Sequence, residues 1–347
     1  MNRERLLYLG GYTAFFLVFF FLFAYWTFPY QRLAGYLSDK VAESSSGYTL
    51  EIGSISPYWL TGVELEDVKV RKTAAEALAT PPPSAGGKDK PIVDQAVRVR
   101  SATARLGLFS LLFGNKALSF DAELEAGDIE GTFDDDGDTK HVVAKLEKVD
   151  LGKLGLLEAL IPLPLKGVLT GDFDLTLSAQ PSKTSGTVKL GIAKLVAGDG
   201  KAKLKLGSMG GLTIDPVAVG DVTLLMDVKE GVGMVKKLSS TGPDLTLDGG
   251  GEVRFAQPLS RSRLGLALKL KLNESYRDKS PRTKVMFSLL DGASSPQVAA
   301  AKTPDGAFQV RLSGPLTSPR VLPGGAGATK GPAPGALPAG APGDDDE

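Results

Sequence analysis

Apolar and polar residues alternate along most of the chain after about residue 45. The clearest cases are residues 169–177 and 264–272, where leucine, glycine or phenylalanine fills every second position and mostly threonine, aspartate or lysine stands between them. Successive side chains of a strand point to opposite faces, so this period of two predicts strands with one apolar and one solvated face. Strands of this kind favour an antiparallel sheet. Shorter alternating stretches occur at residues 120–124, 188–192, 222–228, 245–247, 285–289 and 308–312.

Turn-forming residues separate these stretches at intervals of about ten residues. Asp134–Asp138, Gly249–Gly251 and Pro304–Gly306 supply the aspartate, glycine and proline that tight turns need. This spacing predicts hairpins in succession and therefore a mainly β fold. Helical spacing is scarce, and the candidate helices are Tyr30–Ser44, Leu106–Phe113 and Leu151–Leu160.

The first thirty residues have a different character, because the run from Leu6 to Phe28 is apolar and carries no charge. An apolar helix of about 20 residues matches the roughly 30 Å hydrocarbon core of a bilayer. A secretory signal would have an apolar region of about 7–15 residues and a small-residue cleavage site, and no such site follows this run. Tyr25, Trp26 and Tyr30 instead match an interfacial aromatic belt. We therefore predict an uncleaved transmembrane helix that begins near Leu6 and ends near Phe28.

The predicted domain organisation follows from this anchor and from changes in composition. Residues 1–31 form a cytoplasmic stub and the anchor, and residues 32–323 form the β-rich domain on the far side of the membrane. The charges that flank the anchor give little orientation bias, but long domains translocate largely regardless of charge. Residues 74–91 are interpreted as a flexible insertion, and residues 324–347 as a disordered Gly/Ala/Pro tail with an acidic tip. A docking peptide for a partner is the alternative interpretation of these two segments.

Composition narrows the chemistry that the chain can perform. The 40 basic and 40 acidic residues cancel, so nothing indicates a nucleic-acid partner. The absence of cysteine excludes disulfides, thiol nucleophiles and cysteine-based metal sites. His141 is the only histidine, which excludes a histidine metal cluster. Asp172 and Asp174 share one strand face, as a hydrolase pair would, but a solvated face also carries such charges. We predict no catalytic residue and no cofactor.

One acidic turn resembles a calcium-binding loop. Asp134, Asp136 and Asp138 occupy alternate positions, as calcium ligands do. The positions that require glycine and glutamate are however occupied by Thr139 and Lys145. A charged hairpin tip explains the same residues, so no metal site is predicted.

The abundance of one-sided strands raises the question of what covers their apolar face. One arrangement is a sandwich or closed barrel, in which the sheet covers itself, and closed cores of this kind are the more common among β proteins. The alternative is a strongly curved, open sheet whose inner face forms an apolar groove for acyl chains, since a large exposed apolar surface usually marks a binding site. The groove would be lined by Phe173, Leu175, Leu264, Leu266 and Leu268.

Short motifs follow the predicted anchor in a fixed order. They lie at residues 48–56, 58–70, 104–114, 129–133, 149–151, 163–171 and 312–321. In this order they resemble segments of AsmA-like periplasmic proteins. With the length, the single span and the proline-rich tail, they are most similar to the protein N (GspN) family of type II secretion systems.

The resemblance implies an inner-membrane, non-enzymatic accessory component of a type II secretion system with a curved periplasmic β-sheet domain. Sheet edges or loops would contact other components, such as secretin, pseudopilin or inner-membrane platform subunits. The alternative is an AsmA-like phospholipid-binding or lipid-transfer protein, and a third is an unrelated membrane-tethered scaffold. The secretion hypothesis predicts that the apolar side chains are closed off in a core, whereas the lipid hypothesis predicts a continuous groove.

Overall fold

The fold is given by a computed structural model of the chain. The predicted insertion at 74–91 lies outside the described residues, as do 325–347 of the predicted tail and parts of two candidate helices, 108–113 and 155–160. The described residues are 3–44, 48–59, 61–72, 96–107, 116–154, 163–201, 203–205, 211–213, 215–257, 259–291, 296–316 and 319–324.

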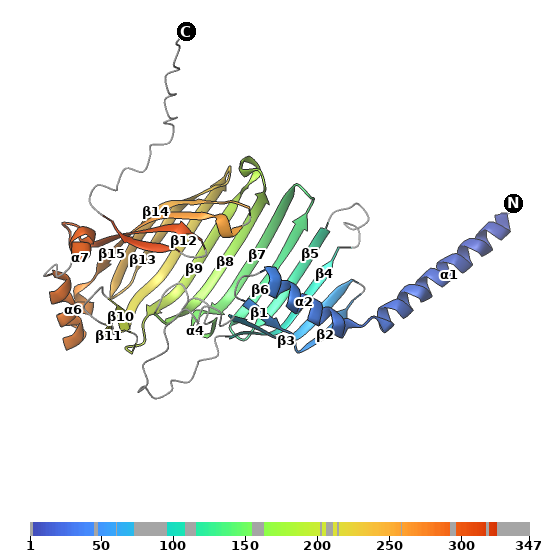
Figure 1. Ribbon diagram of the computed structural model, residues 1–347, viewed down its shortest axis with the longest axis horizontal. Coiled ribbons are helices and arrows are strands. Elements are labelled where there is room, and N and C mark those ends of the chain that lie inside the picture. Colours follow the sequence, from blue (N-terminus) through green and yellow to red (C-terminus); the bar gives the residue numbers. More distant parts are fainter. Residues whose placement is uncertain are drawn as a thin grey trace, which may run out of the picture.

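One antiparallel sheet of 15 strands dominates the described chain, which confirms the prediction of a mainly β fold (Figure 1). The strands lie side by side in the order of the sequence, apart from β2, which pairs with β3 beside β1. A separate two-stranded sheet joins β10 (Lys203–Lys205) and β11 (Gly211–Thr213). The strands of the large sheet are β1 (Tyr48–Glu51), β2 (Ser54–Tyr58), β3 (Gly62–Lys72), β4 (Ala96–Leu106), β5 (Lys116–Leu124), β6 (Gly127–Asp135), β7 (Thr139–Asp150), β8 (Leu165–Ser178), β9 (Ser185–Ala197), β12 (Val217–Lys229), β13 (Val232–Thr241), β14 (Leu245–Arg254), β15 (Arg263–Leu272), β16 (Phe308–Pro315) and β17 (Arg320–Pro323).

The two longest described helices lie at the N-terminal end, where α1 projects away from the sheet (Figure 1). A break at Phe28 and Pro29 separates α1 from α2, because proline lacks an N–H and disfavours helical backbone in the residue before it. The helices are α1 (Arg3–Thr27), α2 (Tyr30–Ser44), α4 (Leu151–Leu154), α5 (Glu274–Arg277), α6 (Pro281–Asp291) and α7 (Pro296–Ala301), with 3-10 turns η3 (Pro181–Lys183) and η5 (Leu259–Arg261).

The predicted transmembrane helix is not shown by the structure. Within the described ranges, no single helix is both long and apolar enough to cross a membrane by itself. The segments Gly11–Thr27 and Tyr30–Ala42 pass the same criteria only together, with a bend of 63° between them. The anchor from Leu6 to Phe28 therefore stays a prediction.

A strand predicted at residues 285–289 is wrong, because this segment lies in helix α6. The start of the helix explains the error. Pro281 occupies the first helical position, where a missing N–H costs nothing. Ser280 accepts a hydrogen bond from the Thr283 amide (3.2 Å), and the Thr283 hydroxyl accepts one from the Ser280 amide (3.0 Å). This reciprocal cap outweighs the short alternation of apolar residues.

The turn predicted at Gly249–Gly251 is also wrong, since these glycines lie inside β14. Gly249 packs against large side chains on one face of the sheet. A Cβ atom on Gly249 would come within 2.7 Å of Leu268 Cδ2 and 3.2 Å of Leu238 Cδ2. Gly249 therefore makes room for leucine side chains on adjacent strands, which is a common use of glycine within a strand.

Gly251→Ala is expected to destabilise the fold by about 3 kcal/mol, because overpacking and left-handed backbone strain each cost about 1–3 kcal/mol. Gly251 has φ +138°, and an added Cβ would meet Leu266 Cα at 2.9 Å and, closer still, the Gly265 carbonyl. The adjacent Gly250 is the control, since its Cβ would meet only the Val235 carbonyl at 4.0 Å. We expect Gly250→Ala to change the free energy of unfolding by under about 1 kcal/mol. Chemical denaturation measures both, and equal effects would contradict this account.

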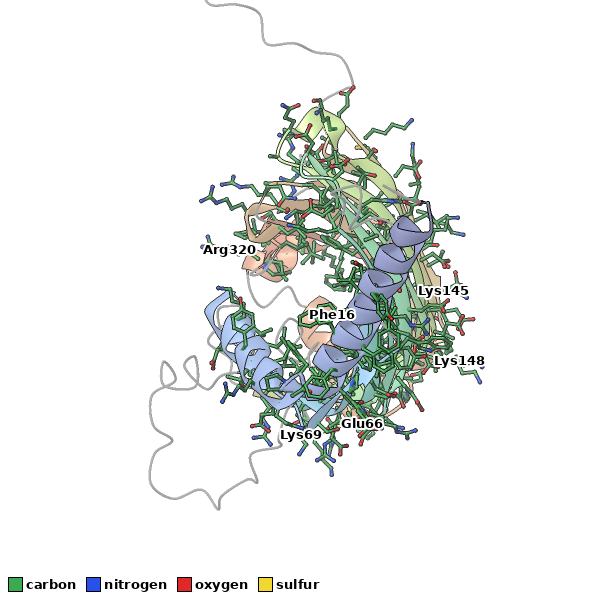
Figure 2. All side chains as sticks on the ribbon, turned by 90° about the vertical axis from the view of Figure 1, so that its right-hand side faces the viewer. Phe16, Glu66, Lys69, Lys145, Lys148 and Arg320 are labelled. Atoms are coloured by element: carbon green, nitrogen blue, oxygen red, sulfur yellow. The ribbon has the colours of Figure 1, made fainter. Side chains whose placement is uncertain are left out.

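The sheet is strongly curved, and several bulges along it provide the bend (Figure 2). The pairing of β7 with β8 shifts between Leu146 and Val149, where Lys148 adopts φ +50°. Similar left-handed residues occur at Asp67 in β3 and Lys194 in β9. A bulge adds a residue to one strand, which bends that strand and increases the local twist.

Curvature does not close the sheet on itself. Among the described strands, β1 with β2 forms one edge and β17 forms the other, and these edges are not paired with each other. The expectation of a self-covering barrel or sandwich is therefore wrong. The bulges bend the sheet into an open arc with one inner and one outer face.

Candidate functional site

A continuous apolar row crosses the inner face of the sheet. Directly paired residues on neighbouring strands lie on the same face. The pairing from β3 to β17 links thirteen positions that are all apolar or glycine. Gly171 is buried, Pro323 is exposed, and the other eleven positions are partly buried. We call these positions the central apolar row: Leu65, Ala102, Ala122, Ile129, Leu146, Gly171, Leu190, Leu224, Leu238, Gly249, Leu268, Val310 and Pro323.

A second row runs beside the central one and is also entirely apolar or glycine. The same pairings link one residue from each strand between β3 and β17. We call it the second apolar row and call the two rows together the trough. Twelve strand-to-strand steps of about 4.8 Å make the trough about 58 Å long. The second apolar row consists of Val63, Ala104, Phe120, Gly131, Ala144, Phe173, Val188, Met226, Val235, Gly251, Leu266, Leu312 and Val321.

The five residues predicted to line a groove all lie on this inner face. Leu268 belongs to the central row, and Phe173 and Leu266 belong to the second row. Leu175 and Leu264 stand two residues away from Phe173 and Leu266 along their strands, and therefore on the same face. All five are partly buried. The sequence prediction thus placed these residues on a common face, although β8 and β15 are separated by four intervening strands.

A small buried core supports the middle of the trough. Val188, Met226, Val228 and Val253 form it, with exposed fractions of 8% or less. Four of the five predicted lining residues pack against this core, and Leu268 is not among them. The core therefore fixes the floor of the trough on β9 to β14, where Val188 and Met226 are its buried members of the second apolar row.

The outer face carries the charges of the alternating strands. Lys145 and Lys148 point away from the arc in Figure 2. The Lys145 ammonium lies 3.7 Å from Glu130 and donates a closer hydrogen bond to Glu147. This bond raises the pKa of Lys145 and lowers the pKa of Glu147. Exposed pairs of this kind contribute little stability, so the outer face is best interpreted as a solvated surface.

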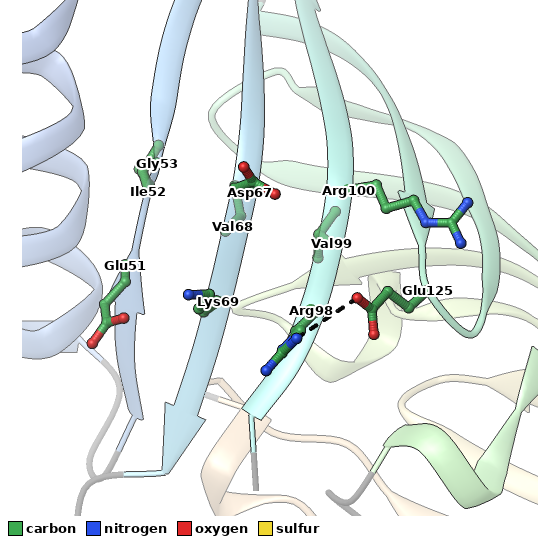
Figure 3. A pocket seen from close by; sticks show the side chains of 10 residues that line it. All are labelled: Glu51, Ile52, Gly53, Asp67, Val68, Lys69, Arg98, Val99, Arg100 and Glu125. Atoms are coloured by element: carbon green, nitrogen blue, oxygen red, sulfur yellow. Dashed lines mark ion pairs between the residues drawn. The ribbon is translucent and has the colours of Figure 1, made fainter. Parts of the chain in front are cut away.

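A polar pocket of about 490 Å³ opens on the charged side of β3 and β4, at the Asp67 bulge (Figure 3). Arg98 lies 4.0 Å from Glu125, and Arg100 lies 3.3 Å from Glu123. The acidic partners of these arginines thus come from the neighbouring strand β5 and its turn. Its lining carries three acidic and three basic side chains, so the pocket is balanced in charge.

An apolar pocket of about 820 Å³ lies where the N-terminal helices meet the sheet. We call it the hinge pocket. Its lining includes Leu17, Leu22 and Tyr25 of α1, Phe28 of the break, Leu33 of α2, and Val63 of β3. Because Val63 is also the first residue of the second apolar row, the pocket adjoins the end of the trough. Sequence reasoning missed this pocket, since periodicity carries no signal for contacts between segments so far apart along the chain.

The candidate catalytic and metal-binding residues have structural roles in hairpins. His141 Nε2 lies 2.8 Å from Asp174 Oδ1 across adjacent strands, with both side chains exposed. The Asp136 carboxylate accepts hydrogen bonds from the amides of Asp138 (3.0 Å) and Thr139 (2.6 Å). These bonds stabilise the hairpin tip. Within the described ranges, no three acidic or histidine side chains gather as a metal-binding group.

A second polar cluster joins the C-terminal helices to the sheet. Tyr276 donates a hydrogen bond to the Asp215 carbonyl (2.7 Å), and burial raises the pKa of Tyr276 to about 12. Lys279 lies 2.7 Å from the Asp244 carboxylate, and Ser280 donates to the Asp215 carboxylate. These polar groups bind one another, so the cluster attaches α5 and α6 to the turns that flank β12 and β13.

Comparison of the chain with protein-family profiles, with curated proteins and with solved structures found no match in any of the three. These comparisons therefore neither support nor contradict the resemblance to AsmA-like and type II secretion proteins.

Proposed function

We propose that this chain is a non-enzymatic, membrane-tethered protein of the bacterial envelope that holds the acyl chains of phospholipids in its trough. The observation that carries the proposal is the central apolar row, which runs across thirteen strands and is at least partly exposed at all but one position. A monomeric soluble protein rarely exposes a contiguous apolar patch larger than a few hundred Å². A ligand that covers such a surface must itself be apolar and elongated.

The dimensions and chemistry of the trough suit acyl chains. One leaflet of a bilayer contributes about half of a roughly 30 Å hydrocarbon core, so an acyl chain of about 15 Å fits several times along a trough of about 58 Å. Transfer of one methylene from water to an apolar surface gains about 0.8 kcal/mol. The polar outer face can remain in water while the inner face holds lipid.

Tethering to the inner membrane is supported by the exposed apolar surface of α1. Phe16, Phe19 and Phe23 are exposed by 66%, 55% and 70%, so α1 is not a core helix buried by the sheet. Its 25 residues extend about 37 Å at 1.5 Å per residue. A bilayer would cover these phenylalanines. We place the N-terminus in the cytoplasm and the sheet in the periplasm, as the sequence predicts.

A type II secretion accessory is the second candidate, and the order of the sequence motifs favours it. Strands β1 and β17 leave two edges of the sheet for contacts with secretin, pseudopilin or platform subunits. This hypothesis also predicted that the apolar side chains form a closed core. The open sheet differs from that expectation, and for this reason the lipid proposal comes first.

Purification of the tagged full-length chain from its own membranes in mild detergent tests the proposal. Mass spectrometry of the same sample identifies proteins and lipids together. We expect at least one phospholipid for each protein chain after extensive washing. Secretion subunits without stoichiometric lipid would overturn the lipid proposal and favour the second candidate. The control is the outer-face variant Val143→Asp, which is purified and washed in the same way and should retain as much lipid as the wild-type chain.

A further inference from the structure

The turn between β2 and β3 holds an exposed tryptophan in an unusual backbone conformation. Trp59 has φ +51°, and its side chain is 72% exposed. Left-handed backbone is unfavourable for a bulky residue, and exposure of an indole to water adds to the cost. The left-handed backbone and the exposed indole of Trp59 both indicate that this side chain contacts another surface.

The turn is bound directly to the end of α1. The Tyr25 hydroxyl donates a 2.5 Å hydrogen bond to the Trp59 carbonyl. Tyr25 lies in the last turn of α1, which ends at Thr27. If α1 crosses the bilayer, this last turn lies at the level of the lipid headgroups, where tyrosine and tryptophan are enriched. The hydrogen bond therefore places the Trp59 backbone at the same depth.

Residues of β2 and β4 lie beside Trp59 and extend the exposed surface of the turn. The Thr61 hydroxyl donates to the Leu106 carbonyl (2.8 Å), which joins the turn to the end of β4. Leu106 is 41% exposed. The Arg105 guanidinium lies 4.5 Å above the Tyr58 ring and donates a 2.8 Å hydrogen bond to its hydroxyl. An apolar tip beside an oriented guanidinium fits the boundary between acyl chains and lipid phosphates.

We infer that the β2–β3 turn docks onto the bilayer that holds α1, with Trp59 inserted at the headgroup boundary and Arg105 facing lipid phosphate. The inference rests on the membrane tethering in the proposed function and adds a second contact to it. Docking holds the Val63 end of the trough at the membrane surface, and the hinge pocket extends from this end into the bilayer along Leu22 and Leu17 of α1. Lipid then passes between bilayer and trough without crossing open water.

Tryptophan fluorescence provides a direct test, because the chain contains only two tryptophans, Trp26 and Trp59. Full-length Trp26→Phe and Trp59→Phe variants each retain a single tryptophan. They are placed in phosphatidylcholine–phosphatidylglycerol vesicles whose acyl chains are brominated either near the headgroup or near the chain end. In Trp26→Phe, we expect shallow bromines to quench Trp59 at least twofold and deep bromines to quench it much less.

A matched control uses a tryptophan on the same rim of the sheet but far from α1. Leu259 is 42% exposed in the connection between β14 and β15. In a chain that lacks both native tryptophans, Leu259→Trp should be quenched by neither lipid. Quenching of that control equal to that of Trp59 would overturn docking by the turn, because the whole rim would then lie on the membrane.

The two native tryptophans separate failure of the inference from failure of the proposed tethering. Quenching of Trp26 without quenching of Trp59 would overturn docking and leave the anchor in place. Absence of quenching at both positions would overturn the membrane placement itself.

Discussion

Ala144→Asp is expected to lower the affinity of the full-length chain for phospholipid about thirty-fold. Ala144 lies in the second apolar row, paired with Gly131 on one side and Phe173 on the other. A carboxylate there remains hydrated and displaces about two to three methylenes of a bound acyl chain from the trough. At about 0.8 kcal/mol per methylene, the loss is about 2 kcal/mol. Titration with a fluorescent phospholipid and lipid counting on the purified variant measure this loss.

The control is the preceding residue on the same strand. Val143 points to the outer face, where its side chain is 37% exposed. Val143→Asp introduces the same charge one position away but on the solvated side, so lipid affinity should stay within a factor of two. Circular dichroism should show the same strand content in both variants. Equal loss of lipid from the two variants, or no loss from Ala144→Asp, would contradict binding in the trough.

The faces of the sheet could be predicted from the sequence, because strand geometry assigns alternate residues to opposite sides. For this reason Phe173 and Leu266 were assigned to one apolar face without knowledge of their neighbours. The same alternation is compatible with a closed barrel and with an open arc. Register and bulges decide between them, and these depend on strand pairing over long distances. Lys148 and Asp67, which adopt left-handed backbone at the bends, carry no distinctive sequence signal.

The wrong and missing predictions have one cause, because a sequence pattern shows only the local neighbours of a residue and not its tertiary contacts. Gly249–Gly251 resembles a turn when its neighbours are unknown, but in the sheet Gly249 makes room for Leu268. The hinge pocket arises from contacts between α1 and β3, which are separated by more than thirty residues. Tyr25 was recognised as an interfacial residue, whereas its hydrogen bond to Trp59 depends on tertiary structure.

Replacement of both Phe16 and Phe20 by lysine is expected to remove the chain from the membrane. The two rings stack with centroids 6.1 Å apart near the middle of the apolar run, and they are 66% and 56% exposed. A lysine at the centre of a transmembrane helix costs about 2.5–3.5 kcal/mol, so two cost about 6 kcal/mol. We expect loss of the carbonate-resistant membrane fraction, measured by immunoblotting of fractionated cells.

The matched control introduces two lysines on α2, outside the predicted span. Gln31 and Tyr36 are exposed, and Tyr36 at 61% is as accessible as the phenylalanines. Gln31→Lys with Tyr36→Lys adds the same charge without placing it in hydrocarbon, so membrane retention should persist. The intact mass of the wild-type chain supplies an independent check, because removal of the first thirty residues would contradict an uncleaved anchor. Membrane retention of the Phe16→Lys, Phe20→Lys variant would show that the sheet or another partner, and not α1, holds the protein at the membrane.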